Sequence, residues 1–327
     1  MKFRTMGKTG LMLSEIGIGA WLTYGGDLER EQSFTCLKTA VEQGINFIDV
    51  ADVYARGRAE EVVGEFMKDY ERSDLVVSSK VFWPMSENIN NRGLSRKHIF
   101  ESIDNSLDRL QMDYIDIYFA HRFDHSTPLE ETVLAFTDVI EEGKVLYWGT
   151  SVWSAMQIER AYAIAREYGA IPPVVEQPPY NMLVRTIELE VFDTARYRGV
   201  GIVPWSPLAG GILTGKYNEG IPENSRAATR EWMKKELTPE VIDKVRKLTE
   251  IAKELDITMS QLALAWILRN PEITSPITGA TKPEHVLSNI GAIDVKLDSS
   301  ILERIEEILQ NKPEWPKYYQ PVDIRGM

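Results

Sequence analysis

Short, nearly uninterrupted runs of hydrophobic residues alternate along the chain with longer segments in which hydrophobic residues recur every three or four positions. The run at residues 115–120, IDIYFA, is typical of a strand covered on both faces, as in a parallel sheet. The longer segments have the period of amphipathic helices. The pattern predicts strands at 14–20, 46–50, 75–79, 114–120, 145–150, 174–177, 201–204 and 275–277, and helices at 30–43, 59–70, 96–110, 130–142, 155–168, 187–198, 239–254, 260–269 and 283–292.

The unbroken alternation of eight strand–helix units predicts an α/β fold of the (β/α)8 TIM-barrel type, with a closed sheet. An open doubly wound sheet is the alternative, and that fold normally has a glycine-rich turn after its first strand. Residues 17–22, GIGAWL, lack the third glycine of that motif. We therefore expect one barrel domain over residues 1–327, with a C-terminal tail at 310–327.

Two segments are expected to lie outside the barrel. Residues 3–13 are predicted to form a small N-terminal hairpin with Gly7 and Gly10 in its turn region. Residues 210–236 are rich in glycine and charge and predict a long functional loop that covers a cofactor. The tail from 314 to 327, which contains Trp315, Tyr318 and Tyr319, either folds against the barrel or covers part of its mouth, and the sequence leaves both open.

Composition narrows the class of partner. The chain has 327 residues, 43% of them hydrophobic, and a formal net charge of −12, which argues against nucleic acid and anionic membranes as main partners. Its single cysteine, Cys36, allows no internal disulfide and fits a reducing compartment. The start has no apolar signal core, and no apolar run is long enough to span a bilayer. We expect a cytoplasmic protein.

Four polar residues stand at the ends of consecutive predicted strands, where barrel enzymes place their catalytic groups. Asp49 ends the second strand, Tyr54 follows in the loop, Lys80 is expected just past the third strand, and His121 just past the fourth. Singly, each has an ordinary explanation: a helix cap, a surface lysine or a loop histidine. Together, on consecutive units, they indicate one catalytic site at one face of the barrel.

The chemistry of this set points to proton transfer. A nearby ammonium favours the anion of a tyrosine, so Lys80 is expected to lower the pKa of Tyr54 and let it deliver a proton near neutral pH. Asp49 would hold Lys80, and His121 would hydrogen-bond a substrate oxygen. Because none of the four donates hydride, a cofactor must supply it.

These residues carry a family resemblance. The segment 46–54, NFIDVADVY, resembles the Asp-to-Tyr motif of aldo-keto reductases, and residues 79–80 and 120–122 resemble the family's lysine and histidine positions. Five further segments resemble the branch that contains the beta subunits of voltage-gated potassium channels: 93–99 (GLSRKHI), 147–151 (YWGTS), 205–211 (WSPLAGG), 289–293 (NIGAI) and 311–313 (NKP).

The chain departs from that branch at two positions. His121 stands where the channel beta subunits have asparagine, so the four catalytic residues of the dedicated reductases are all present. Val152 stands where the beta subunits have arginine, which puts one cofactor contact in doubt.

The resemblance implies an extended NADP(H) along the barrel mouth. It places Ser151 and Gln177 at the nicotinamide carboxamide and residues 205–211 beside the pyrophosphate, where glycines allow close backbone approach. The start of the last helix, after Lys282, suits an adenosine 2′-phosphate. The expected cofactor-binding residues are Trp21, Ser151, Gln177, Trp205, Ser206, Pro207, Leu208, Gly210, Lys216, Arg226, Gly279, Thr281, Lys282, His285 and Asn289.

The predicted function is NADPH-dependent reduction of a small aldehyde or ketone to an alcohol, in a pocket lined by Tyr24 and Trp83. The alternative is a regulatory, redox-sensing subunit that binds NADP(H) and turns over slowly, as the channel-like branch would allow. That branch often forms rings of subunits, which leaves a homo-oligomer open.

Two other kinds of site are disfavoured. Residues 210–216 nearly match a phosphate-binding P-loop, but Tyr217 stands where Ser or Thr would bind magnesium. His121, Asp124 and His125 supply too few ligands at strand ends for a barrel metallohydrolase, so no metal is expected.

Overall fold

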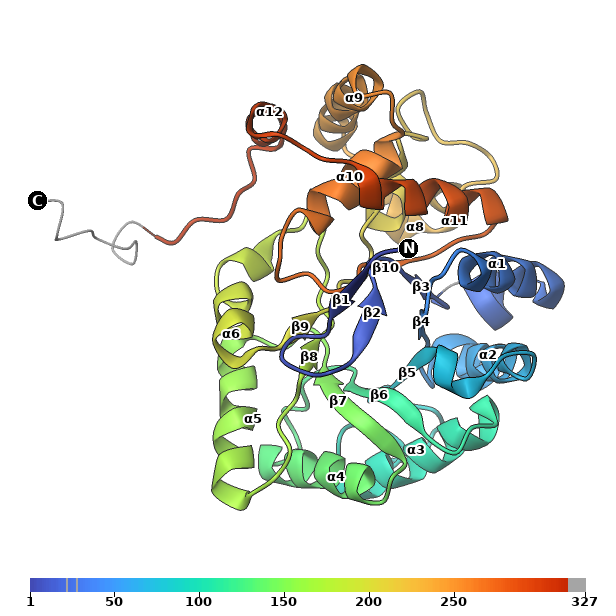
Figure 1. Cartoon of the computed structure of the whole chain (residues 1–327), viewed down its shortest axis with the longest axis vertical. Coiled ribbons are helices and arrows are strands. Elements are labelled where there is room, and N and C mark those ends of the chain that lie inside the picture. Colours follow the sequence, from blue (N-terminus) through green and yellow to red (C-terminus); the bar gives the residue numbers. More distant parts are fainter. Residues whose placement is uncertain (22, 28, 317–327) are drawn as a thin grey trace, which may run out of the picture.

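Eight parallel strands form the centre of the computed structural model, which describes residues 1–21, 23–27 and 29–316 (Figure 1). Their order is β10-β3-β4-β5-β6-β7-β8-β9, so neighbours in the sheet follow one another in the chain, except for β10 and β3, which are the last and the first of the eight. The strands are β3 (Gly17–Gly19), β4 (Phe47–Asp49), β5 (Val76–Val81), β6 (Ile115–Ala120), β7 (Val145–Thr150), β8 (Val175–Glu176), β9 (Gly201–Ile202) and β10 (Ile277–Thr278).

The sheet closes on itself beside β9. Ile202 forms a parallel bridge with Ile273, and the Thr274 amide donates to the Ile202 carbonyl at 2.7 Å. The Ile277 amide then donates to the Pro204 carbonyl at 2.8 Å, and β10 continues into its pairing with β3. The predicted (β/α)8 barrel is therefore confirmed over an open sheet.

Helices surround the strands on the outside (Figure 1). Several begin where the sequence supplies a cap: Ser154 and Gln157 form a capping box, as do Thr258 and Gln261, which satisfies backbone amides at the helix start. The helices are α1 (Arg30–Glu42), α2 (Arg58–Met67), α3 (Arg96–Leu110), α4 (Leu129–Glu141), α5 (Ala155–Tyr168), α6 (Val191–Arg198), α9 (Pro239–Glu254), α10 (Met259–Leu268), α11 (Pro283–Ile290) and α12 (Ser299–Leu309).

The structure differs from the sequence prediction in several elements. The segment predicted as a long loop contains the short helices η5 (Ala209–Thr214), α7 (Arg226–Thr229) and α8 (Glu231–Glu236). Helix α12 was not predicted, although the Asp298 side chain caps it and its buried residues recur at a helical spacing. Tyr318 and Tyr319 of the predicted tail lie outside the described residues.

The N-terminal hairpin closes the end of the barrel opposite the strand C-termini. Its strands β1 (Phe3–Thr5) and β2 (Met12–Ser14) pair antiparallel, as predicted. Met6 and Leu13 are fully buried and pack with Phe47, Ile117 and other residues of the barrel interior. The hairpin therefore supplies the apolar floor of the barrel.

Arg4 fixes this hairpin to the closing segment. Its guanidinium donates to the carbonyls of Leu268 (2.8 Å), Asn270 (3.2 Å) and Ile273 (2.8 Å), and pairs with Glu15 at 2.7 Å. One half-buried side chain thus satisfies three carbonyls beside the point where the barrel closes.

Replacing Arg4 by alanine removes these bonds and leaves the nearly buried Glu15 without its cation. We expect Arg4→Ala to lower the free energy of unfolding by about 2–4 kcal/mol. Urea denaturation measures the change. The matched control is Lys2→Ala, which loses an exposed ion pair with Asp294 and should cost less than about 1 kcal/mol. Equal losses in the two variants would contradict the role given to Arg4.

Candidate active site

The C-terminal ends of β4, β5 and β6 bring the four predicted catalytic residues together. Asp49 is the last residue of β4, and His121 directly follows β6. Lys80 lies inside β5 rather than past its end, which corrects the prediction. The register pairs Asp49 with Ser78, so Lys80 lies two residues further along β5 than the partner of Asp49.

A buried ion pair joins Lys80 to Asp49. The Lys80 ammonium is fully buried, lies 2.7 Å from Asp49 Oδ2 and also donates to the Val50 carbonyl at 2.7 Å. The other oxygen of Asp49 accepts from Ser78 Oγ at 2.7 Å and from Gln177 Nε2 at 2.9 Å. Burial lowers the pKa of Lys80, and the charge of Asp49 opposes that shift.

A strained turn directs Tyr54 toward this pair. Tyr54 begins η2 (Tyr54–Gly57), in which Ala55 (φ 49°), Arg56 (φ 58°) and Gly57 (φ 89°) all have left-handed backbones. Such strain persists only where the surroundings over-determine it, and it gathers at functional sites. The Lys80 ammonium lies 4.9 Å from the centroid of the Tyr54 ring.

The pKa of Tyr54 departs from expectation. Burial raises the pKa of Tyr54 well above its ordinary value, and the charge of Asp49 adds to the rise. The cation that opposes the rise is Arg122, whereas Lys80 is engaged by Asp49 and faces the ring. The net lowering of the Tyr54 pKa that we expected from Lys80 is therefore wrong, because burial and the charge of Asp49 outweigh the nearby cations, and the phenol keeps its proton at neutral pH.

His121 stands beside Tyr54 as a neutral imidazole. The two ring centroids are 5.9 Å apart at an interplanar angle of 75°, and His121 is 6% exposed. Burial lowers the pKa of His121 well below its ordinary value, and the cations Lys80 and Arg122 lower it further. Its buried Nδ1 has no hydrogen-bond partner within the described chain. The phenol and the imidazole can together hold a ligand oxygen.

The two residues predicted for the substrate pocket lie in different places. Trp83 is 38% exposed, and its ring centroid is 6.3 Å from that of His121, so it borders the site. Tyr24 is only 1% exposed and packs in the hydrophobic core, where Cys36 influences its pKa. Tyr24 belongs to the turn η1 (Thr23–Asp27), and its ring is buried in the core. The structure therefore does not place Tyr24 at the mouth.

A glycine turn after β9 is flanked by two predicted phosphate-binding cations. Gly210 (φ 66°) and Gly211 (φ 104°) have left-handed backbones. A Cβ on Gly211 would come within 2.9 Å of Lys216 Nζ, and one on Gly210 would come within 3.8 Å of an Arg226 guanidinium nitrogen. The bare backbone with adjacent cations suits the oxygens of a pyrophosphate. Trp205, Ser206, Pro207 and Leu208 lead into this turn.

The segment from η5 to α8 reaches across the mouth to the end of β3. Trp21 follows β3 and is 40% exposed. Its ring lies 6.3 Å from the ring of Trp232 in α8, and the Arg226 guanidinium lies 5.9 Å from its centroid. The segment therefore lies next to the end of β3, and its covering of a cofactor stays a prediction.

The start of α11 adds further polar groups. Lys282 immediately precedes the helix, and Thr281 Oγ1 lies 3.3 Å from His285 Nδ1. Burial lowers the pKa of His285, and the charges of Lys282 and Lys216 lower it further, so the glycine turn and α11 share one electropositive region. Asn289 is 3% exposed and follows His285 by one helical turn. Gly279 is exposed and stands two residues before Thr281.

Ser151 and Gln177 connect this mouth to the buried ion pair. Ser151 Oγ donates to the Gln177 carbonyl at 2.9 Å, and the Gln177 amide donates to Asp49. The two residues predicted for the nicotinamide carboxamide therefore lie together next to the four catalytic candidates.

Three residues near the site were missed by sequence reasoning. They are Ser78, which orients Asp49, Arg122, which lies beside His121, and Glu176, which is fully buried. Each is a polar residue in or directly after an apolar run of a predicted strand, which was the available signal.

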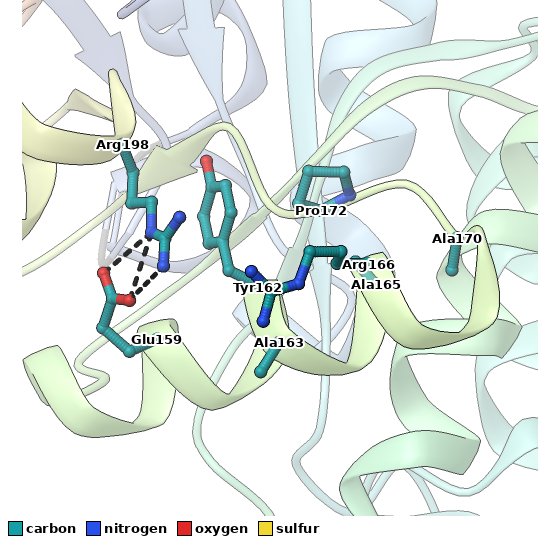
Figure 2. Close-up of a pocket in the computed structure, with 8 residues that line it drawn as sticks. All are labelled: Glu159, Tyr162, Ala163, Ala165, Arg166, Ala170, Pro172 and Arg198. Carbon is teal, nitrogen blue, oxygen red and sulfur yellow. Dashed lines mark hydrogen bonds and ion pairs between the residues drawn. The ribbon is translucent and has the colours of Figure 1, made fainter.

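The hollow drawn in Figure 2 is a separate surface feature. It has a volume of about 370 Å³, lies against α5, and contains the Glu159–Arg198 ion pair. None of the predicted catalytic or cofactor residues lines this hollow, so it is not part of the candidate active site.

The described residues contain neither a candidate metal cluster nor a candidate membrane-spanning helix. No group of three or more His, Cys, Asp or Glu side chains there could hold a metal ion. Separately, none of the helices described is both long enough and apolar enough to cross a membrane.

Comparison with known proteins agrees with the resemblance seen in the sequence. The model of the aldo/keto reductase family matches residues 15–310. A protein of Arabidopsis thaliana described as a probable voltage-gated potassium channel subunit beta is 44% identical, and the match covers 98% of this chain and 100% of that protein. A protein of the same description from Oryza sativa subsp. japonica is 43% identical with the same coverage.

A buried polar network lies behind the Tyr54 turn. Asp52 and Glu60 are both 0% exposed. Asp52 accepts from Ser102 Oγ at 3.0 Å, while Glu60 accepts from Ser79 Oγ at 2.5 Å and pairs with Arg109 at 2.6 Å. This network holds Ser79, which precedes Lys80, and Asp52, which stands two residues before Tyr54.

The network makes stability depend on pH. Burial and the charge of Glu60 raise the pKa of Asp52 to about 8. Below about pH 4 this carboxyl is protonated in both folded and unfolded chains. Between about pH 4 and pH 8 only the unfolded chain releases the proton. The unfolded state is therefore favoured as the pH rises, and the free energy of unfolding of the natural chain falls. We expect Asp52→Asn, which cannot titrate, to gain stability relative to the natural chain from about pH 5 to pH 8.

Urea denaturation at these two pH values measures the difference. Asp113→Asn, an exposed carboxylate with no such burial, is the matched control and should show a constant difference from the natural chain. A difference for Asp52→Asn that does not change with pH would show that the Asp52 carboxyl ionises normally.

Proposed function

The chain belongs to the aldo/keto reductase family, an oxidoreductase family that uses a nicotinamide cofactor, and we propose that it reduces aldehydes or ketones to alcohols with NADPH. The observation that carries the proposal is the position of the Tyr54 ring, which lies next to both the ammonium of the Lys80–Asp49 pair and the neutral His121. That arrangement has a proton donor, a means of stabilising the donor's anion, and a hydrogen-bonding group for the carbonyl oxygen.

In the proposed reaction the carbonyl oxygen lies between Tyr54 and His121. The neutral imidazole donates a hydrogen bond to it, which orients the substrate and stabilises developing negative charge. The bound nicotinamide supplies the hydride that the carbonyl carbon accepts. Tyr54 gives its proton to the oxygen, so that hydride and proton together make the alcohol. The Lys80 ammonium, held by Asp49, stabilises the phenolate that remains.

The phosphate groups of the cofactor are assigned to the electropositive side of the mouth. The glycine turn with Lys216 and Arg226 fits a pyrophosphate, because two cations lie beside a backbone that has no side chains at Gly210 and Gly211. Lys282 stands at the start of α11, where the helix dipole adds to its charge, and suits the additional 2′-phosphate of NADPH.

A second candidate function follows from the two relatives, which are described as probable voltage-gated potassium channel beta subunits. A channel-type beta subunit that senses redox state would bind NADPH but turn over slowly. His121 favours the reductase, because the resemblance to channel beta subunits breaks at this position. Tight NADPH binding by the purified chain, with negligible turnover of every aldehyde tested, would favour the sensor instead.

The proton-donor assignment is tested with Tyr54→Phe. We expect kcat for aldehyde reduction to fall by about 10²–10⁴-fold, which is the usual contribution of a general acid. NADPH binding, measured by fluorescence titration, should change by less than about twofold because the hydroxyl is not assigned to the cofactor. Tyr168→Phe, an exposed tyrosine on α5, is the control. Reduction by Tyr54→Phe at the natural rate would remove Tyr54 from the mechanism.

The 2′-phosphate assignment is tested with Lys282→Ala. Loss of one charge-assisted contact should weaken NADPH binding by about ten- to a hundredfold while NADH binding, which involves no 2′-phosphate, stays within about twofold. Dissociation constants for both cofactors give the comparison. Lys296→Ala removes an exposed lysine elsewhere and controls for net charge. If NADPH and NADH binding weaken equally, Lys282 does not recognise the 2′-phosphate.

A further inference from the structure

Arg122 is held against the wall of the active-site mouth. It directly follows His121, and its Nη1 donates to the His121 carbonyl at 2.5 Å and to Ser151 Oγ at 3.4 Å. Its guanidinium carbon lies 5.6 Å from the centroid of the Trp83 ring. One edge of the guanidinium is thereby fixed to the protein, with an aromatic face beside it.

The charge of Arg122 is not neutralised by the protein. Within the described part of the chain no carboxylate forms an ion pair with it, and neither Nε nor Nη2 donates a hydrogen bond. Other buried or half-buried arginines differ in this respect. Arg72 pairs with Asp116, Arg109 with Glu60, and Arg185 with both Glu188 and Glu306.

The carboxyl that most influences Arg122 is already engaged. Glu176 is fully buried, accepts from Thr150 Oγ1 at 2.5 Å, and accepts from the Trp153 amide at 3.2 Å. Burial raises the pKa of Glu176 to about 7, so near neutral pH much of it carries no charge. A partly buried cation with two free donors and no countercharge is a site for an anionic ligand group.

Arg122 also lies close to the reacting groups. The Trp83 ring is 6.3 Å from the His121 ring and the His121 ring is 5.9 Å from the Tyr54 ring. Trp83 therefore lies beside both the guanidinium and the His121 ring, which borders the place assigned to the carbonyl oxygen. A substrate about the size of one aromatic ring could lie on Trp83 with its carbonyl at Tyr54 and an opposite substituent at Arg122.

We propose that Arg122 determines substrate specificity by pairing, through Nε and Nη2, with a carboxylate carried by the carbonyl substrate. This inference rests on the proposed reductase function and names its substrate class, the short oxo-carboxylic acids. The pairing is bidentate, since a guanidinium presents its free donors in the geometry of a carboxylate. Lys216, Arg226 and Lys282 are assigned to cofactor phosphates and do not compete for this role.

The test compares two substrates that differ in one charge. They are 4-carboxybenzaldehyde and its neutral methyl ester, methyl 4-formylbenzoate. The quantity measured is the ratio of their kcat/KM values for the natural chain, Arg122→Gln, Arg122→Lys and the control Arg160→Gln, which removes an exposed arginine on α5. We expect the natural chain to prefer the acid and Arg122→Gln to lower the ratio by at least about tenfold.

The remaining variants separate specificity from structure. Arg122→Lys keeps the charge but not the fork, so its ratio should lie between the two, and Arg160→Gln should leave the ratio within about twofold. If Arg122 only supports His121 and Ser151, both kcat/KM values fall together, the ratio is unchanged, and the proposal is overturned.

A binding measurement keeps this inference separate from the proposed reaction. The carboxylate product, 4-(hydroxymethyl)benzoate, is titrated into each variant in the presence of NADP⁺ while tryptophan fluorescence is followed, because Trp83 lies beside Arg122. Saturable quenching that weakens at least about tenfold in Arg122→Gln supports the site even if no aldehyde is reduced, an outcome in which only the reductase function fails. Equal titrations in both variants would overturn the site.

Discussion

The buried ion pair between Lys80 and Asp49 is the interaction on which the site depends. Removing two charges from water is costly, and the cost is met only if hydrogen bonds satisfy the remaining lone pairs and protons. The satisfying groups come from three strand ends: the Val50 carbonyl after β4, Ser78 in β5, and Gln177 after β8. Because these groups lie across the barrel, the pair is stable only when the strands have their native register.

Backbone strain in the structure has a similar distribution. Ala55, Arg56, Val152, Ser206 and Ala209 have left-handed backbones, and all follow strand C-termini at the barrel mouth. For a β-branched residue such as Val152 (φ 59°) this conformation is especially unfavourable. Buried groups hold it: Glu176 accepts from the amide of the next residue, Trp153. The other non-glycine residues with positive φ, Gln111, Asp256 and Gln310, stand just past helix ends, so the strained turns that follow strands are the ones that shape the proposed binding sites.

The sequence predicted the regular parts well because they follow from local pattern. Helices 96–110, 155–168 and 239–254 match the structure at both ends, since a capping side chain precedes each one. The short helices within residues 210–236 and the inward Tyr24 were missed, because neither has a strong periodic signal. The role of Arg122 could not be predicted from the sequence. That role depends on Trp83 and Ser151, which lie beside Arg122 only in the folded barrel.

The distribution of charge gives the mouth two distinct positive regions on a chain of net charge −12. Lys216, Arg226 and Lys282 gather on the side of β3 and α11, whereas Arg122 stands beside His121 with no countercharge. An anionic ligand is repelled by the whole molecule at long range, but within about one Debye length, roughly 8 Å in physiological salt, the local cations dominate. Separation of the two regions matters chemically, because a single region would let substrate carboxylates compete with cofactor phosphates. The arrangement allows a phosphate-bearing cofactor and an acidic carbonyl compound to be bound at the same time, with Tyr54 and His121 between them.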